Sequence, residues 1–354
     1  MALIKPTAFK KGDRIAIVSL SSGILGEDFT AHQRHLGEQR LRALGLQPVY
    51  MPNACRGVRY LAAHPQARAA DLKTAFQDPT IRGVVAAIGG MDTYRIIPYL
   101  MEDPAFCQAV RAHPKIFTGF SDTTINHLML YRLGLESFYG LNFLNDLAEL
   151  ATQMLPYTQK TWERLFHNPE HSIIPPSTIW YEERTDFSAA AIGQPRISHP
   201  DYGYQVLRGR GQTQGRLWGG CLDSLSGALV GKAQTIAQRY HLLLSPGELQ
   251  DKLLFLETSE DCPRPELYRQ MLAQLDEAGI LAAVRGLLIG KPQNKKYEVE
   301  YQAALLAATQ AYQTPILYNV NIGHAYPHTV LPYGVLAQVN WDQPRLEILE
   351  PWFA

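Results

Sequence analysis

The chain has 354 residues, 46% of them hydrophobic and 19% charged, and its 33 Lys and Arg residues balance its 33 Asp and Glu residues. This length favours two domains with a sizeable core. The neutral balance argues against nucleic acid as a partner, because a phosphate backbone normally demands a basic protein face. The four cysteines are scattered without a C-x-x-C pair, so we expect neither a disulfide framework nor a zinc cluster.

Several patterns typical of other protein classes are missing from the sequence. No segment resembles a signal peptide, and no apolar run approaches the length of a membrane span. There is no H-E-x-x-H metal motif and no G-x-G-x-x-G dinucleotide fingerprint. We therefore expect a cytoplasmic protein without a membrane partner, a metal or a cofactor.

The first part of the chain alternates strand and helix patterns. The predicted strands are residues 14–20, 47–51, 83–88 and 115–118. The predicted helices are residues 31–44, 65–76, 94–100 and 122–133. This alternation is typical of an α/β fold with a mostly parallel sheet and helices on both faces.

The middle of the chain has a different composition. Residues 168–212 contain several prolines and few long apolar runs, which predicts a linker and the entry to a second domain. We therefore expect domains at 1–167 and 213–354. The strands predicted in the second domain are residues 253–256, 284–289, 315–320, 330–339 and 345–349. Its predicted helices are residues 221–230, 265–278 and 301–312.

Ser121 lies where a predicted strand runs directly into a predicted helix, in the segment KIFTGFSDTT. A serine on such a sharp turn exposes its hydroxyl beside the free amides of a helix N-terminus. Simple helix capping is the alternative for Ser121. The pair Gly89-Gly90 follows another buried strand, and its backbone could approach a ligand closely or could form an ordinary tight turn.

Two further polar residues follow predicted strands. Glu257 ends the apolar run in KLLFLETSE, and His324 follows a strand and a glycine in YNVNIGHAYPH. A structural salt bridge and a buried core histidine are their ordinary alternatives. Together with Ser121 they supply the nucleophile, the carboxylate and the base that acyl transfer requires. Spacing alone does not bring the three together, so the residues indicate a possible serine hydrolase.

The ordered motifs resemble those of the LD-carboxypeptidase family of serine peptidases (family S66), and the LETSE form is closer to its microcin-immunity branch. The resemblance covers nearly the whole chain. The motifs are GDRIAIVSLSS, the glycine pair, GFSDTT, GRLWGGCLDSL, LLFLETSE and NIGHAYPHTVLPYG. It implies a flavodoxin-like or Rossmann-like N-terminal domain with the nucleophile, and a smaller C-terminal α/β domain, swivelling and barrel-like, with Glu and His.

The resemblance also implies roles for individual residues. Ser121 would be the nucleophile, His324 the general base and Glu257 the group that orients the imidazole. The amide of Asp122 and one from the Gly90–Met91 turn would form the oxyanion hole. A homodimer is expected, with a small peptide or an aminoacyl-nucleotide as substrate. Activity would fall below the pKa of His324, around neutrality or lower.

The sequence departs from the family at one position, where Cys221 follows the Trp-Gly-Gly motif in place of asparagine. This puts the choice of substrate in doubt and makes Cys221 a substrate-contacting candidate. Trp180 is a second one, either in a loop that closes over substrate or in the core. Two other function classes stay open: a catalytically silent peptide- or nucleotide-binding module, and an amidotransferase-like enzyme with a cysteine nucleophile.

Overall fold

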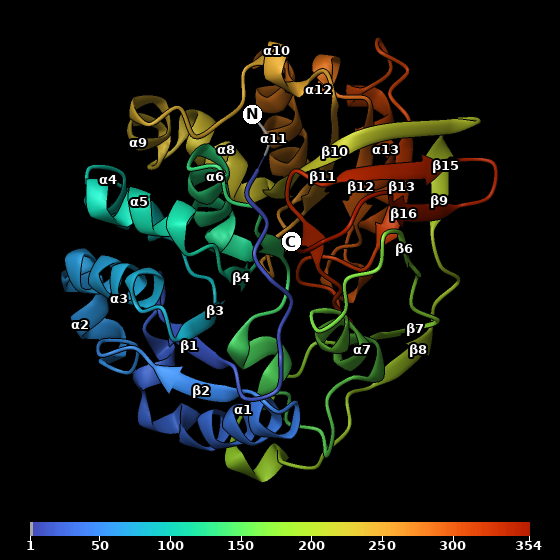
Figure 1. Ribbon diagram of the computed structural model, residues 1–354. Coiled ribbons are helices and arrows are strands. Elements are labelled where there is room, and N and C mark those ends of the chain that lie inside the picture. The colour runs from blue at the N-terminus through green and yellow to red at the C-terminus, as the bar shows by residue number, and fades with distance from the viewer. Residues whose placement is uncertain (1–2) are drawn as a thin grey trace. The chain divides into compact units, whose positions relative to one another are not determined.

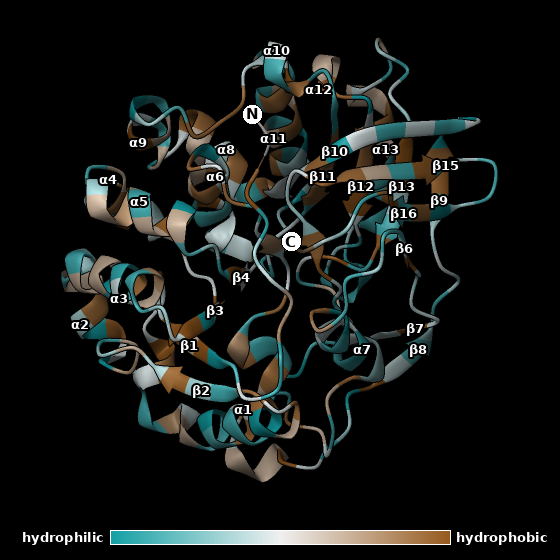
Figure 2. Cartoon of the chain, viewed as in Figure 1, coloured by the Kyte–Doolittle hydropathy of each residue, from teal (hydrophilic) through white to brown (hydrophobic). Residues whose placement is uncertain are grey.

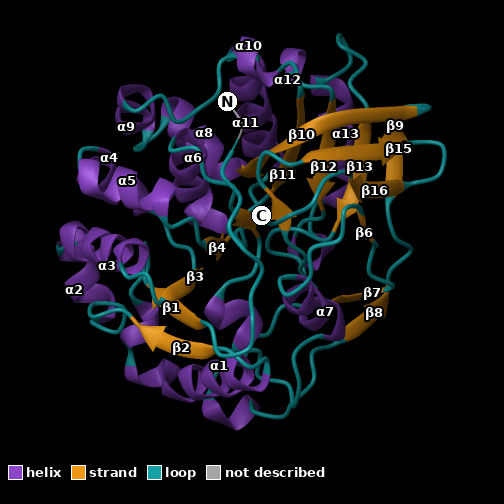
Figure 3. Cartoon of the chain, viewed as in Figure 1, coloured by secondary structure: helices purple, strands orange, loops and turns teal. Residues whose placement is uncertain are grey.

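The computed structural model describes residues 3–354, and their contacts divide them into two compact units (Figure 1). The first unit consists of the chain up to Asn168 together with Arg184–Arg196 and Trp352–Ala354. The second unit consists of Pro169–Glu183 and Ile197–Pro351. Each unit contains its own sheet and helices (Figure 3).

The first unit is built on a parallel sheet with the strand order β5-β4-β3-β1-β2. Its strands are β1 (Arg14–Val18), β2 (Gln47–Tyr50), β3 (Ile81–Ala86), β4 (Ile116–Gly119) and β5 (Phe138–Tyr139). This is the 2-1-3-4-5 order of flavodoxin-like folds, in which ligands bind outside the carboxyl ends of the strands. The sheet brings the ends of β3 and β4 side by side, where the glycine pair and Ser121 follow.

Seven α-helices belong to this unit within the described residues. They are α1 (Ala31–Ala43), α2 (Gly57–Ala63), α3 (Pro65–Gln77), α4 (Ile97–Met101), α5 (Pro104–Ala112), α6 (Thr124–Arg132) and α7 (Pro156–Arg164). Asp103 caps α5 by accepting hydrogen bonds from the amides of Ala105 and Phe106. Strand β1, which lies between β3 and β2, is buried along most of its length, and its brown colour in Figure 2 shows that it is apolar. Both features fit a sheet covered on both faces.

The second unit has a mixed sheet in the order β6-β16-β15-β10-β11-β12-β13-β9. The four middle strands from β10 to β13 run parallel, and the outer strands are antiparallel to their neighbours. The strands are β6 (Ser172–Ile174), β9 (Gln205–Arg208), β10 (Gln212–Cys221), β11 (Lys252–Glu257), β12 (Gly286–Gly290), β13 (Ile316–Val320), β15 (Leu336–Asn340) and β16 (Arg345–Ile348). A separate hairpin pairs β7 (Ile179–Tyr181) with β8 (Ser198–Pro200).

The helices of the second unit lie mostly between its parallel strands in the sequence. They are α8 (Leu222–Val230), α9 (Gln234–Arg239), α10 (Pro246–Leu249), α11 (Pro265–Glu277), α12 (Ile280–Ala283) and α13 (Glu298–Ala308). The expected α/β class, with a parallel sheet in the N-terminal region and a second sheet C-terminally, is confirmed.

Two segments differ in detail from the expectation. Residues 168–212 contain the four short strands β6 to β9, and the part from Arg184 to Arg196 packs with the first unit. The single strand expected over residues 330–339 is divided into β14 (Leu331–Pro332) and β15, since Gly334 takes a positive φ of 78° between them. A left-handed residue turns the chain and interrupts a strand.

Candidate active site

Ser121 occupies a strained turn between β4 and α6. Its φ of 66° lies in the left-handed region, which is uncommon for any residue other than glycine. The turn is held by its own hydrogen bonds: the amide of Ser121 donates to the hydroxyl of Tyr139 (3.2 Å), and the hydroxyl of Thr124 donates to the carbonyl of Ser121 (2.7 Å). Local packing therefore sustains the backbone geometry that a nucleophile turn requires.

The glycine pair lies against this turn. A Cβ added to Gly89 would be 2.7 Å from Ser121 Cβ and 2.8 Å from its Oγ, so only glycine permits this approach. The following residues, Gly90 and Met91, are exposed, and Met91 is 88% accessible. Within residues 3–354 no hydrogen bond engages the amides of Gly90 and Met91. These two N–H groups directly follow the glycine that packs against Ser121, and they stay candidates for an oxyanion hole, as does that of Asp122.

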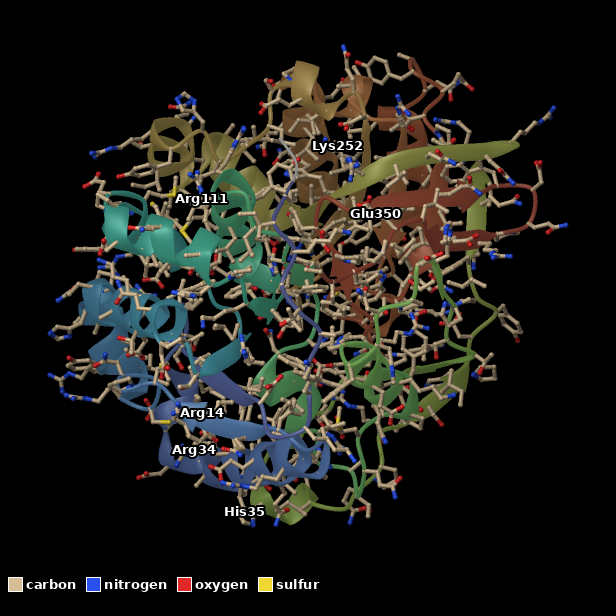
Figure 4. All side chains as sticks on the ribbon, viewed as in Figure 1. Arg14, Arg34, His35, Arg111, Lys252 and Glu350 are labelled. Carbon is tan, nitrogen blue, oxygen red and sulfur yellow. The ribbon has the colours of Figure 1, made fainter. Side chains whose placement is uncertain are left out.

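Glu257 and His324 form a buried hydrogen-bonded pair in the second unit. Glu257 ends β11, which begins at Lys252, labelled in Figure 4. Its fully buried Oε2 lies 2.7 Å from His324 Nδ1, which donates to it. His324 follows β13 in a loop closed by the hydrogen bond from the Thr329 amide to the Asn321 carbonyl (2.7 Å). The structure thus joins two residues 67 positions apart in the sequence.

A second carboxylate contacts the same imidazole and was missed by the sequence reasoning. Glu260 Oε2 lies 3.0 Å from His324 Nε2, and the Glu260 side chain is 64% exposed. Burial alone would lower the pKa of His324, but Glu257 and Glu260 together raise it to about 10, above the neutral range expected from the sequence. The hydrogen bond from His324 in turn lowers the pKa of Glu260 to about 2. The signal was present, because Glu260 is the last residue of the LETSE motif.

Cys221 lies beside this pair. It ends β10 as the cross-strand neighbour of Glu257, and the residue is only 1% exposed. Its thiol donates to Asp223 Oδ2 at 3.7 Å. Burial, reinforced by the charges of Glu257 and Asp223, raises the pKa of Cys221 well above its ordinary value. A thiol of this kind is a poor nucleophile, since the thiolate is the reactive form.

Trp180 lies on strand β7 of the second unit and is half-buried. Its ring stacks on His199 with centroids 4.3 Å apart, and Lys295 Nζ lies 5.3 Å from the ring centroid. The strand also contacts the loop of the histidine, because the amide of Tyr181 donates to the carbonyl of Tyr326 (3.2 Å). Trp180 is therefore placed on an ordered hairpin, and its contact with substrate stays a prediction.

Two kinds of feature are absent from residues 3–354. No helix there is long and apolar enough to cross a membrane. No group of three or more His, Cys, Asp or Glu side chains in that range has an arrangement that could hold a metal ion.

Comparison with known families identifies the chain's class. Residues 15–140 match the LD-carboxypeptidase N-terminal domain, and residues 214–339 match the LD-carboxypeptidase C-terminal domain. The chain belongs to this family, peptidase family S66, and the resemblance drawn from its motifs is confirmed.

Individual relatives agree with this assignment. An MccF-like protein from Streptococcus pneumoniae, solved in complex with AMP, is 43% identical, with a TM-score of 0.91 over 95% of this chain and 98% of that one. A probable murein peptide carboxypeptidase of Bacillus subtilis (strain 168) is 26% identical over 95% of this chain and 91% of its own length. The microcin C7 self-immunity protein MccF, solved with aspartyl sulfamoyl adenosine, is 20% identical, with a TM-score of 0.83 over 99% of this chain and 100% of that one. This likeness shows that the two chains share a fold.

Proposed function

We propose that the chain is a serine amidase and carboxypeptidase that hydrolyses an amide near the C-terminus of its substrate, with Ser121, His324 and Glu257 as its catalytic triad. The observation that carries the proposal is the buried 2.7 Å hydrogen bond between His324 Nδ1 and Glu257. A carboxylate in that position fixes the imidazole tautomer, so that Nε2 faces the reacting groups. The hydroxyl of Ser121, on its strained turn, is the proposed nucleophile for this base.

In the acylation step, which requires neutral His324 with Glu260 moved off Nε2, Ser121 Oγ attacks the carbonyl carbon of the amide while its proton passes to His324 Nε2. The carbonyl oxygen becomes an oxyanion, for which the amides of Asp122 and of the Gly90–Met91 turn are the proposed donors. The C–N bond then breaks as His324 Nε2 returns the proton to the leaving amine. Losing one oxyanion donor typically costs about 2.7–4 kcal/mol in the barrier.

In the deacylation step, a water molecule gives its proton to His324 and attacks the ester carbonyl. The second tetrahedral intermediate collapses, the bond to Ser121 Oγ breaks, and the proton returns from His324 to that oxygen. The acid product leaves and the enzyme is restored. Throughout, the Glu257 carboxylate stabilises the imidazolium that forms twice in each cycle.

The proposed substrates are of two kinds. An amide that joins an acidic amino acid to a modified nucleotide, as in microcin C self-immunity, is favoured by the relative that is 43% identical and binds AMP. A murein tetrapeptide, from which D-alanine would be released, is favoured by the similarity to the probable murein peptide carboxypeptidase. Cytoplasmic location and a homodimer complete the proposal.

The proposal is tested by mass spectrometry of products from both substrates, an aspartyl or glutamyl nucleotide amide and a murein tetrapeptide ending in D-alanine. We expect wild-type protein to cleave one of them and Ser121→Ala to lose activity by about a million-fold. Ser188→Ala, which changes an exposed serine, is the matched control. Near-native turnover by a folded Ser121→Ala protein would overturn the assignment of the nucleophile.

The alternative classes give different results in the same assay. A silent binding module would bind one of the compounds, measured by calorimetry, without forming product. A cysteine-dependent enzyme would survive Ser121→Ala and lose activity on alkylation of Cys221. The buried thiol of Cys221, with its raised pKa, favours the serine enzyme over this second alternative.

A further inference from the structure

The side chain of Asp122, the residue after the proposed nucleophile, is buried and accepts two hydrogen bonds. Its Oδ2 accepts one from the hydroxyl of Ser21 (2.6 Å) and one from the amide of Thr93 (2.8 Å). Ser21 follows β1, Thr93 follows β3 and Asp122 follows β4. One carboxyl group therefore ties together the loops at the ends of three neighbouring strands.

A second buried group binds two of these loops, those after β1 and β3. Arg68 on α3 is fully buried and donates to the carbonyls of Leu20 (3.2 Å) and Ser21 (3.1 Å). It also donates to both carboxylate oxygens of Asp92, at 2.6 and 3.2 Å. A bidentate pair of this kind fixes orientation as well as distance. The hydroxyl of Ser21 accepts a further hydrogen bond from the Asp92 amide (3.3 Å).

These bonds bracket the segment from Gly89 to Thr93. The carbonyl of Gly89 accepts from the amide of Ser22 (3.1 Å) at one end, and the amide of Thr93 donates to Asp122 at the other. The amides of Gly90 and Met91 lie between the two anchors. Donors for an oxyanion are effective only when they are held in place before charge develops. What fixes these two amides relative to Ser121 is thus the attachment of both ends of the segment.

The nucleophile turn shares this attachment through the peptide backbone. Asp122 is covalently bonded to Ser121, and its carboxyl group holds the loop that carries the candidate donors. Moving the Thr93 end of the segment away from Asp122 stretches the 2.8 Å hydrogen bond between them. Burial raises the pKa of Asp122, although the donors Ser21 and Thr93 oppose that rise.

We propose that Asp122 is a positioning residue. Its carboxyl group, hydrogen-bonded to the hydroxyl of Ser21, sets the positions of the Gly90 and Met91 amides relative to Ser121 Oγ. The inference rests on the proposed function, because it concerns the oxyanion hole of that reaction. It assigns to the side chain of Asp122 a role separate from that of its amide. The role lies in the transition state, so it acts on kcat more than on KM.

The test compares Asp122→Asn, Ser21→Ala and the double variant with wild type on the substrate that wild type cleaves. We expect kcat to fall about 10- to 100-fold in Asp122→Asn, less than the loss of a whole oxyanion donor, with KM changed less than about 3-fold. A boronic acid analogue of the substrate, which presents a tetrahedral oxyanion, should lose affinity by a similar factor. The double variant should lose less than the product of the single losses, since both act through one contact.

Asp71→Asn is the matched control, because Asp71 is a buried carboxyl of the same unit whose hydrogen bonds come from the amide and side chain of Asn53 and not from segment 89–93. It should lower the melting temperature without lowering kcat. If Asp122→Asn does not fold, Ser21→Ala still removes the hydroxyl contact. That single variant must then lower kcat with little change in KM.

The outcomes separate this inference from the proposed function. Unchanged kcat and analogue affinity in folded Asp122→Asn and Ser21→Ala, with active wild type, would overturn the positioning role. An equal loss of kcat in Asp71→Asn would also overturn it, since general destabilisation would then be the cause. Wild-type protein without any cleavage of either substrate, and without labelling of Ser121 by a fluorophosphonate, would instead overturn the proposed function.

Discussion

Glu260 Oε2 lies 3.0 Å from His324 Nε2, on the opposite side of the imidazole from Glu257. An ionised carboxylate only accepts hydrogen bonds, so with both carboxylates in place both ring nitrogens must carry protons. The observed arrangement therefore holds His324 as an imidazolium, which cannot take a proton from a serine. In the proposed mechanism Glu260, with its exposed side chain, must therefore leave Nε2 before His324 can take a proton.

Replacing Glu260 should change the titration of His324. In Glu260→Gln we expect the pKa of His324 to fall from about 10 by about 1 unit or more, since a carboxylate at this distance favours the charged form. The base is active when neutral, so the acid limb of the kcat/KM profile should move to lower pH. NMR of the imidazole nitrogens and the pH–rate profile measure the two effects. Glu266→Gln, at an exposed carboxylate paired with Arg269, should change neither.

Removing the charge of Glu257 should be more damaging. In Glu257→Gln the shape is kept, but the amide cannot hold the required tautomer and the imidazolium loses its buried counter-charge. We expect kcat to fall by about 10⁴-fold, the scale of the equivalent loss in serine proteases. Steady-state kinetics with circular dichroism of the variant check this. A loss below about 10-fold in a folded protein would contradict the role of Glu257.

The close approach of Gly89 to the serine can be tested by adding one methyl group. In Gly89→Ala the new Cβ would meet Ser121 Cβ and Oγ at 2.7 and 2.8 Å, so the hydroxyl must shift. A displacement of a reacting group by about 1 Å can lower the rate about 100-fold, so we expect a loss of that order in Gly89→Ala. Gly227→Ala, within α8 where nothing lies within 4 Å of the added Cβ, is the control and should be stabilised by about 0.5–1 kcal/mol. Equal kinetics in the two variants would contradict the tight packing.

The cysteines should differ in reactivity. Burial raises the pKa of both the Cys55 and the Cys221 thiol, but Cys55 is exposed and Cys221 is buried, so iodoacetamide at pH 7.5 should modify Cys55 first. We expect alkylated protein to keep its activity, with peptide mass spectrometry reporting which thiols carry the label. Cys55→Ser removes the fast-reacting site as a control. Inactivation in step with the labelling of Cys221 would support a cysteine nucleophile instead.

The ion pairs of Glu149 should matter for stability. Its carboxylate, 1% exposed, binds Arg184 and lies 2.7 Å from Arg196 Nε. Glu149→Gln leaves these guanidinium groups without their counter-charge, and breaking a buried pair in this way costs about 3–5 kcal/mol. Urea denaturation should show that loss of unfolding free energy. The exposed Glu163→Gln should change it by less than about 0.5 kcal/mol.

Several strands next to the candidate site were predictable because they are almost fully buried and mostly apolar. This holds for β1, β11 and β13, whose ends were placed within two residues. The strands between residues 169 and 208 were not found, because they are three or four residues long, half-exposed and without a regular apolar period. Their positions depend on pairing with distant strands, which the local sequence does not encode.

The candidate site residues were proposed from their places at strand ends, whereas the pairing of Glu257 with His324 was expected only from the family resemblance. The pairing of Glu257 with His324 rests on the order of β11, β12 and β13 in the sheet. The contact of Glu260 with Nε2 depends on a side-chain rotamer in a loop, and the bonds of Asp122 join three loops far apart in the sequence. Such contacts arise only after the sheet has brought the loops together.

The first unit is assembled from three separate stretches of the chain, and this limits how the gene can be divided. A fragment that ends at Asn168 would omit Arg184 and Arg196, the partners of Glu149. It would also omit the C-terminal Ala354, whose amide donates to the carbonyl of Pro6 (2.9 Å). Neither unit can therefore be obtained as one continuous fragment of the chain. A fragment that contains the whole first unit would need both distant pieces joined back by designed linkers.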